Sequence, residues 1–155
     1  MADHGVNQVA RDQFARAFAM LENAIAAFPD ESWRECGGCR PAGISIHILE
    51  TVEFYMSGKP AENFEWGHRF GLDWEGAPAP ELPNKADVTA YLHDVKDASE
   101  QWLIATDLMA AESSYVWTGK SVLDRTLYVL RNTLHHIGQL ALALRTVGAE
   151  PPEWQ

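Results

Sequence analysis

The chain has 155 residues, 46% of them hydrophobic, and a formal net charge of −10. This length predicts a single domain over residues 1–155 with a sizeable core, and the composition excludes wholesale disorder. The excess of acidic residues argues against nucleic acid or an anionic membrane as a partner, because phosphate groups need a basic surface. No apolar run approaches the roughly 18–20 residues of a membrane span. The N-terminus carries no signal-peptide core either, so we expect a cytoplasmic protein.

Apolar residues recur at helical spacing in four long stretches. The first stretch runs from Val6 to Phe28, and Pro29 ends it because proline cannot continue a helix. The second stretch covers residues 44–56 and is followed by glycine and proline. Both stretches predict amphipathic helices with defined ends.

The third and fourth stretches carry recognisable start and stop signals. The third covers about residues 86–111, and Asn84 with Asp87 resembles a capping box at its start. The fourth begins near Ser121 and ends at Gly148, a residue type that often follows the last turn of a helix. No segment shows convincing strand alternation.

A long connection separates the second and third predicted helices. It runs from Ser57 to Lys85 and is rich in proline, glycine and aromatic residues. Its aromatic side chains lead us to expect an ordered crossover that packs on the helices. Four amphipathic helices with one long crossover predict an all-α four-helix bundle. Such bundles place metal or ligand sites between facing helices.

Three histidines are candidates for such a site. His47 lies near the start of the second predicted helix, where a neutral imidazole is either a metal ligand or a hydrogen-bonded core residue. His135 and His136 are adjacent on the fourth helix and about 100° apart, so at most one of them shares a site with His47. His136 follows Asn132 by four residues, which places both side chains on one helix face.

Three segments carry a family resemblance, residues 46–51, 64–74 and 128–154. The stretch from Tyr128 to Trp154, with Asn132-x-x-x-His136 followed by Ile-Gly-Gln-Leu, resembles the C-terminal part of the DinB-like (DinB/YfiT) superfamily of metalloproteins. The segment Ile46–Thr51 is similar to the second-helix motif of that family. The resemblance implies a four-helix bundle that holds one divalent metal ion, zinc or nickel, at His47, Asn132 and His136.

Position 132 departs from the family pattern, which has histidine there. An asparagine offers only a neutral amide oxygen, a weaker ligand for zinc or nickel than imidazole. The sequence leaves three outcomes open. Asn132 is a poor third ligand, another residue such as His68 or a cysteine completes the site, or the site holds no metal.

The resemblance also implies a function. It predicts a metal-dependent enzyme that acts on a small molecule, as a thiol-dependent transferase, isomerase or hydrolase. In this family the metal binds a low-molecular-weight thiol and favours its thiolate form. We also expect a homodimer. The alternative is a non-catalytic bundle, small-molecule-binding or purely structural, with a degenerate metal site.

Other polar residues near these positions have several interpretations. Cys36-Gly-Gly-Cys39 has three interpretations: a redox motif, half of a zinc site with His47 as one further ligand, or a turn built by its glycines. We favour the turn. Gln139 is three residues beyond His136, a spacing at which it can fix the tautomer of that ring. Glu50 stands at the same spacing from His47, but we expect it on a solvated helix face.

Overall fold

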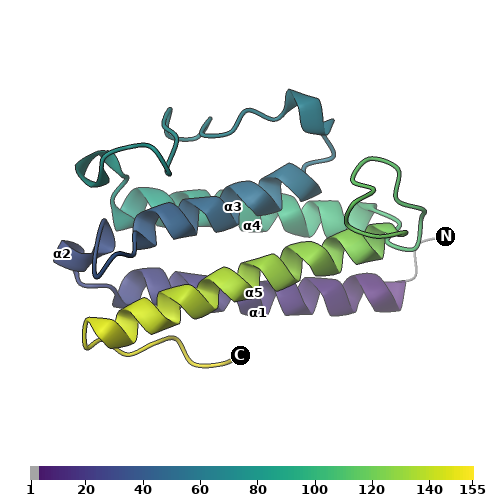
Figure 1. Cartoon of the computed structure of the whole chain (residues 1–155). Coiled ribbons are helices and arrows are strands. Elements are labelled where there is room, and N and C mark those ends of the chain that lie inside the picture. Colours follow the sequence, from purple (N-terminus) through teal and green to yellow (C-terminus); the bar gives the residue numbers. More distant parts are fainter. Residues whose placement is uncertain (1–3) are drawn as a thin grey trace.

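The computed structural model describes residues 4–155, and this part of the chain is helical without a named strand (Figure 1). Residues 1–3 of the predicted domain lie outside the described residues. The longer helices are α1 (His4–Ala27), α3 (Pro41–Met56), α4 (Lys85–Ala105) and α5 (Val122–Thr146), and the short ones are α2 (Asp30–Trp33), η1 (Ala61–Asn63) and η2 (Ala79–Glu81). The predicted all-α class is confirmed.

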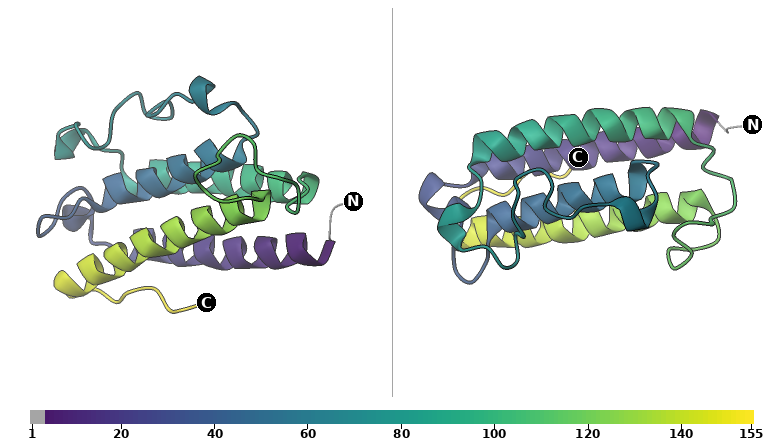
Figure 2. Two further views of the ribbon diagram at one scale, coloured as in Figure 1. Left: turned by 45° about the vertical axis from the view of Figure 1, so that its right-hand side comes forward. Right: turned by 90° about the horizontal axis from the view of Figure 1, so that it is seen from above.

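The four long helices lie side by side in an arrangement consistent with the predicted bundle (Figures 1 and 2). α1 and α3 each pack chiefly against α4 and α5. α3 and α5 run in opposite directions along their shared face (Figure 1). Within residues 4–155, no helix combines the length and the apolar character needed to cross a membrane.

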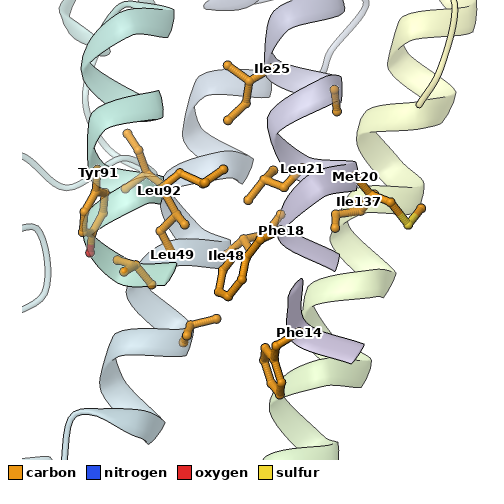
Figure 3. Packing of buried hydrophobic residues seen from close by; sticks show 14 of the residues in the cluster. Phe14, Phe18, Met20, Leu21, Ile25, Ile48, Leu49, Tyr91, Leu92 and Ile137 are labelled. Atoms are coloured by element: carbon orange, nitrogen blue, oxygen red, sulfur yellow. The ribbon is translucent and has the colours of Figure 1, made fainter. Parts of the chain in front are cut away.

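The apolar stripes of the long helices meet in one core (Figure 3). Burial of each large side chain contributes about 1.5–3 kcal/mol to folding, which offsets much of the entropy lost by ordering the helices. Representative fully buried members from the four helices are Phe18, Leu21, Ile48, Leu49, Leu92 and Leu144.

The third predicted helix is shorter than its apolar spacing indicated. α4 ends at Ala105 and not near residue 111. Residues 106–121 form a loop whose ends are joined by backbone hydrogen bonds, including Glu112 N–H to the Lys120 carbonyl oxygen at 2.9 Å. The prediction was wrong because it followed apolar spacing alone, while this loop is organised by contacts with residues distant in sequence.

The segment between α3 and α4, residues 57–84, runs along the outer side of α3 (Figure 1). Gly67 N–H donates a hydrogen bond of 2.6 Å to Oε1 of Glu50 on α3. The Arg40 guanidinium donates to the carbonyl oxygens of Glu75, at 3.0 Å, and Ala77. These bonds tie the segment to α3 and to the loop that precedes it.

The start of α5 is fixed by a capping box. Ser121 Oγ accepts a hydrogen bond from Asp124 N–H, and the Asp124 carboxylate accepts from Ser121 N–H at 2.9 Å. Reciprocal bonds of this kind satisfy two backbone donors that have no partner within the helix. The box therefore fixes the first residue of the helix that carries Asn132 and His136.

Asp124→Asn is expected to destabilise the fold at neutral pH, and the loss should shrink in acid. The hydrogen bonds from Ser121, from its side chain first and then its backbone, and from Lys120 hold the pKa of Asp124 below its ordinary value of 3.8. A carboxylate with a lowered folded-state pKa stabilises the protein above its unfolded value, and this contribution disappears as pH falls through the folded-state pKa. Urea unfolding of the two proteins between about pH 7 and pH 3 measures the difference. Asp97→Asn, in the exposed middle of α4, is the charge-matched control and should show a smaller difference.

Candidate metal centre

The structure brings His47 and His136 together across the α3–α5 interface. Their ring centroids are 4.6 Å apart and the rings are nearly perpendicular, at 88°. Both side chains are half-buried, whereas the adjacent His135 is exposed. Because zinc–nitrogen bonds are about 2.0–2.1 Å long, rings at this separation can both reach one ion.

A hydrogen bond orients the His136 ring. Its Nδ1 lies 2.7 Å from Oε1 of Gln139, one turn further along α5. An amide oxygen only accepts, so this bond places the proton on Nδ1 and leaves the lone pair on Nε2. A partner of this kind is the usual way in which a metal-binding histidine is held in one tautomer.

His47 is kept neutral by its surroundings. Burial, and secondarily the positive charge of a protonated His136, lower the pKa of His47 to about 4. The Trp74 ring covers it, with the two ring centroids 5.4 Å apart. Trp74 can approach this closely because residue 43 is glycine, where a Cβ would lie only 2.7 Å from Cε3 of the indole. The result is an uncharged imidazole at neutral pH, the form that binds metals.

Asn132 lies one helical turn before His136 on the same face of α5. Its Nδ2 is buried and has no hydrogen-bond partner among residues 4–155. A buried amide without a partner costs about 1–3 kcal/mol. Rotation of the amide by half a turn would present Oδ1 at the same buried position, because the two ends have nearly the same shape. Together with one nitrogen from each of the two imidazoles, this oxygen would form a donor set that suits a divalent cation.

The antiparallel register of α3 and α5 places Thr51 near Asn132. Thr51 is one turn beyond His47, as Asn132 is one turn before His136, and its buried hydroxyl also lacks a partner in the described part of the chain. One turn further along, the rings of Tyr55 and Tyr128 are 5.4 Å apart, which confirms the register. Two polar groups without partners therefore lie next to the histidine pair.

His68 and the cysteines do not complete this centre. Among residues 4–155, no group of three or more His, Cys, Asp and Glu side chains is arranged to hold a metal ion. His68 Nε2 instead lies 2.7 Å from Oε2 of Glu53. Of the three outcomes open from the sequence, completion by His68 or a cysteine is not the one observed.

Cys36 and Cys39 flank a tight turn. Their backbones exchange two hydrogen bonds of 2.8 and 2.7 Å, and Gly37 and Gly38 between them adopt φ values of +52° and +78°. Both cysteines are free, and burial raises the pKa of each thiol. The interpretation as a glycine turn agrees with this geometry, and the protonated thiols are weak nucleophiles.

Glu50 was expected on a solvated face, and this expectation was wrong. Its side chain is only 2% exposed because residues 57–84 cover this side of α3. Burial raises the pKa of Glu50, while the hydrogen bond from Gly67 N–H lowers it less strongly. The sequence did contain a signal. Residues 44–56 are apolar around much of the helix, a pattern typical of a helix buried on several sides.

A cavity of about 250 Å³ adjoins the histidine pair on the side of residues 57–84. His47 and Glu50 from α3 form one wall. The other lining residues come from the covering segment and are Trp66, Gly67, Asp73, Trp74 and Glu75.

Comparison of the chain with protein-family models finds no match, and a search of curated proteins finds no significant relative.

Proposed function

We propose that this protein is a DinB-like four-helix bundle with residues 57–84 as its crossover, and that it binds one divalent metal ion, zinc or nickel, between α3 and α5. The observation that carries the proposal is the pairing of the His47 and His136 rings, with centroids 4.6 Å apart. Two histidines from facing helices are a common basis of metal sites in helical bundles. The resemblance of residues 46–51 and 128–154 to the family motifs supports the same assignment.

Each proposed ligand has a defined role. His47 supplies a neutral imidazole whose proton affinity is lowered by burial. His136 supplies Nε2, held in position by the bond from Nδ1 to Gln139. Asn132 supplies an amide oxygen after rotation of its side chain. Three protein ligands leave coordination positions for a substrate, which is the arrangement of catalytic rather than structural sites.

The activity proposed is a metal-dependent reaction of a small molecule. When bound, the metal would favour the deprotonated sulfur of a low-molecular-weight thiol. The chain's own residues would orient the reactants, because Trp74 lies against His47 and the cavity beside it offers room for a small molecule. The reaction proposed is a transfer, an isomerisation or a hydrolysis. We also propose that the protein acts in the cytoplasm as a homodimer, and that neither nucleic acid nor a membrane is its partner.

Elemental analysis of protein purified without chelator tests the metal site. We expect about one zinc or nickel ion per chain, the stoichiometry of a single site. His47→Ala and His136→Ala should lose the metal, because each removes one of the two nitrogen donors. His135→Ala is the matched control and should retain it.

A chain without metal would support the alternative function, a non-catalytic bundle. If the purified chain holds no zinc or nickel, and takes up neither when supplied with them, the metal proposal is wrong. The protein is then a non-catalytic bundle in which the asparagine at position 132 marks a degenerate site.

A further inference from the structure

The cavity beside His47 is small, and most of the side chains that line it are acidic or aromatic. It lies between α3 and the covering segment 57–84 and has a volume of about 250 Å³. Ligand pockets for drug-sized molecules are about 300–1,000 Å³, so this cavity fits a smaller molecule. Five of its seven lining residues are carboxylates or tryptophans, namely Glu50, Asp73, Glu75, Trp66 and Trp74.

The side chains that line the cavity carry a net negative charge. Three carboxylate side chains line it, and none of the described residues around it is a lysine or arginine. Glu50 is only 2% exposed, and its Oε1 accepts the Gly67 N–H at 2.6 Å. Its Oε2 accepts no hydrogen bond within residues 4–155 and is not one of the buried atoms left without a partner, so this oxygen is open to the cavity. A positive group in the cavity would offset the cost of holding this largely buried carboxylate in its charged form.

Both tryptophans are held in place by neighbours. Trp74 lies against His47 and over Gly43. Trp66 packs on Phe54 and Phe64, with ring centroids 5.0 and 4.9 Å apart, although its own side chain is 53% exposed. Such exposure leaves part of the indole free for another contact. Indole rings bind cations through their faces better than other aromatic side chains do.

The spacing of the acidic groups disfavours a small inorganic cation. No three His, Cys, Asp or Glu side chains among the described residues converge as metal ligands do. The carboxylates of the cavity are therefore too dispersed to chelate one ion. An organic ammonium ion is larger, and its positive charge is spread over the groups attached to nitrogen. It can therefore contact separated carboxylates and aromatic faces at the same time.

We propose that this cavity binds a small organic cation, a free amine or quaternary ammonium compound, between the two tryptophans and beside Glu50. This proposal goes beyond the metal centre and does not require it. Because His47 lines the cavity, a cation bound here would lie next to the proposed metal centre, where it could be a substrate. The net charge of −10 also favours approach of a cation.

Isothermal titration with choline, tetramethylammonium and ethanolamine tests the proposal. At least one of them should bind about tenfold more tightly than 3,3-dimethylbutan-1-ol, the neutral compound with the shape of choline. Glu50→Gln, which keeps an oxygen for Gly67 N–H, should weaken binding about tenfold. Trp66→Leu should weaken it about fivefold through loss of the indole face.

Matched controls lie outside the cavity. Glu81→Gln removes the same charge and Trp154→Leu the same ring from exposed positions, and each should change binding by less than about twofold. Circular dichroism of each variant verifies that it is folded. Metal content is measured on the same samples, so failure of cation binding is distinguishable from failure of the metal proposal.

Three results would overturn the proposal. The first is that none of the three cations binds. The second is that the neutral compound binds as tightly as choline, or that the controls lose as much affinity as Glu50→Gln and Trp66→Leu. The third is that the protein co-sediments with phosphatidylcholine vesicles but binds no free choline, which would assign a lipid headgroup instead.

Discussion

Asn132→His is expected to tighten zinc or nickel binding by about tenfold or more, because imidazole is a stronger donor for these ions than a neutral amide oxygen. The position suits the change. It is one turn from His136 on the same face of α5, and the present side chain leaves Nδ2 buried with no partner in the described part of the chain. Competition titration with a chromophoric chelator measures the affinity of parent and variant.

Two further substitutions test the assignment of the histidines. His136→Ala should abolish binding in the parent and in the Asn132→His background, since it removes the ring paired with His47. His135→Ala should leave the affinity nearly unchanged, because that side chain is exposed. If Asn132→His binds no better than the parent, position 132 does not face the metal. Loss of metal in His135→Ala alone would mean that the wrong histidine was assigned.

Helical periodicity predicted those parts of the fold that depend on local sequence. The stripes ending at Phe28 and Met56 correspond to α1 and α3, whose ends are marked by prolines and glycines that act locally. The start of α5 near Ser121 was also predicted, and in the structure Ser121 and Asp124 form a capping box there. Such signals need no knowledge of neighbouring elements.

The surroundings of the candidate site could be predicted only in part. The i, i+4 spacing placed Asn132 and His136 on one face, and the angular offset separated His135 from it. The burial of Glu50 was missed because it depends on where residues 57–84 lie, and no periodic pattern in that segment reports its path. The same holds for Trp74, whose contact with His47 depends on Gly43 in another element.

The end of α4 was missed for a related reason. The loop 106–121 is organised around Glu112, whose Oε1 accepts hydrogen bonds from Ser114 N–H and Tyr115 N–H at 2.8 and 2.9 Å. The carboxylate is paired with Arg125 on α5, with 3.0 Å between Oε2 and Nε. This pairing joins two elements, so apolar spacing within one of them does not reveal it.

Arg125→Met is expected to lower the free energy of unfolding by about 3–5 kcal/mol, because it leaves the Glu112 carboxylate buried without its counter-charge. The side chains of Glu112 and Arg125 are only 1% and 11% exposed. Nε and Oε2 are close but not aligned for a hydrogen bond, so the attraction is mainly electrostatic. The guanidinium also lies over the rings of Trp102 and Tyr115, at 5.3 and 4.7 Å, and these contacts are lost too.

A double-mutant cycle separates the charge from the packing. Glu112→Gln retains an oxygen for the two loop N–H groups, so adding it to Arg125→Met should recover part of the lost stability. Arg11→Met is the control, because the Arg11–Glu100 pair is 30% and 45% exposed and should contribute about 1 kcal/mol or less. Urea unfolding measures all four variants. If Arg125→Met costs no more than Arg11→Met, the buried pair does not hold the loop, and the early end of α4 needs another cause.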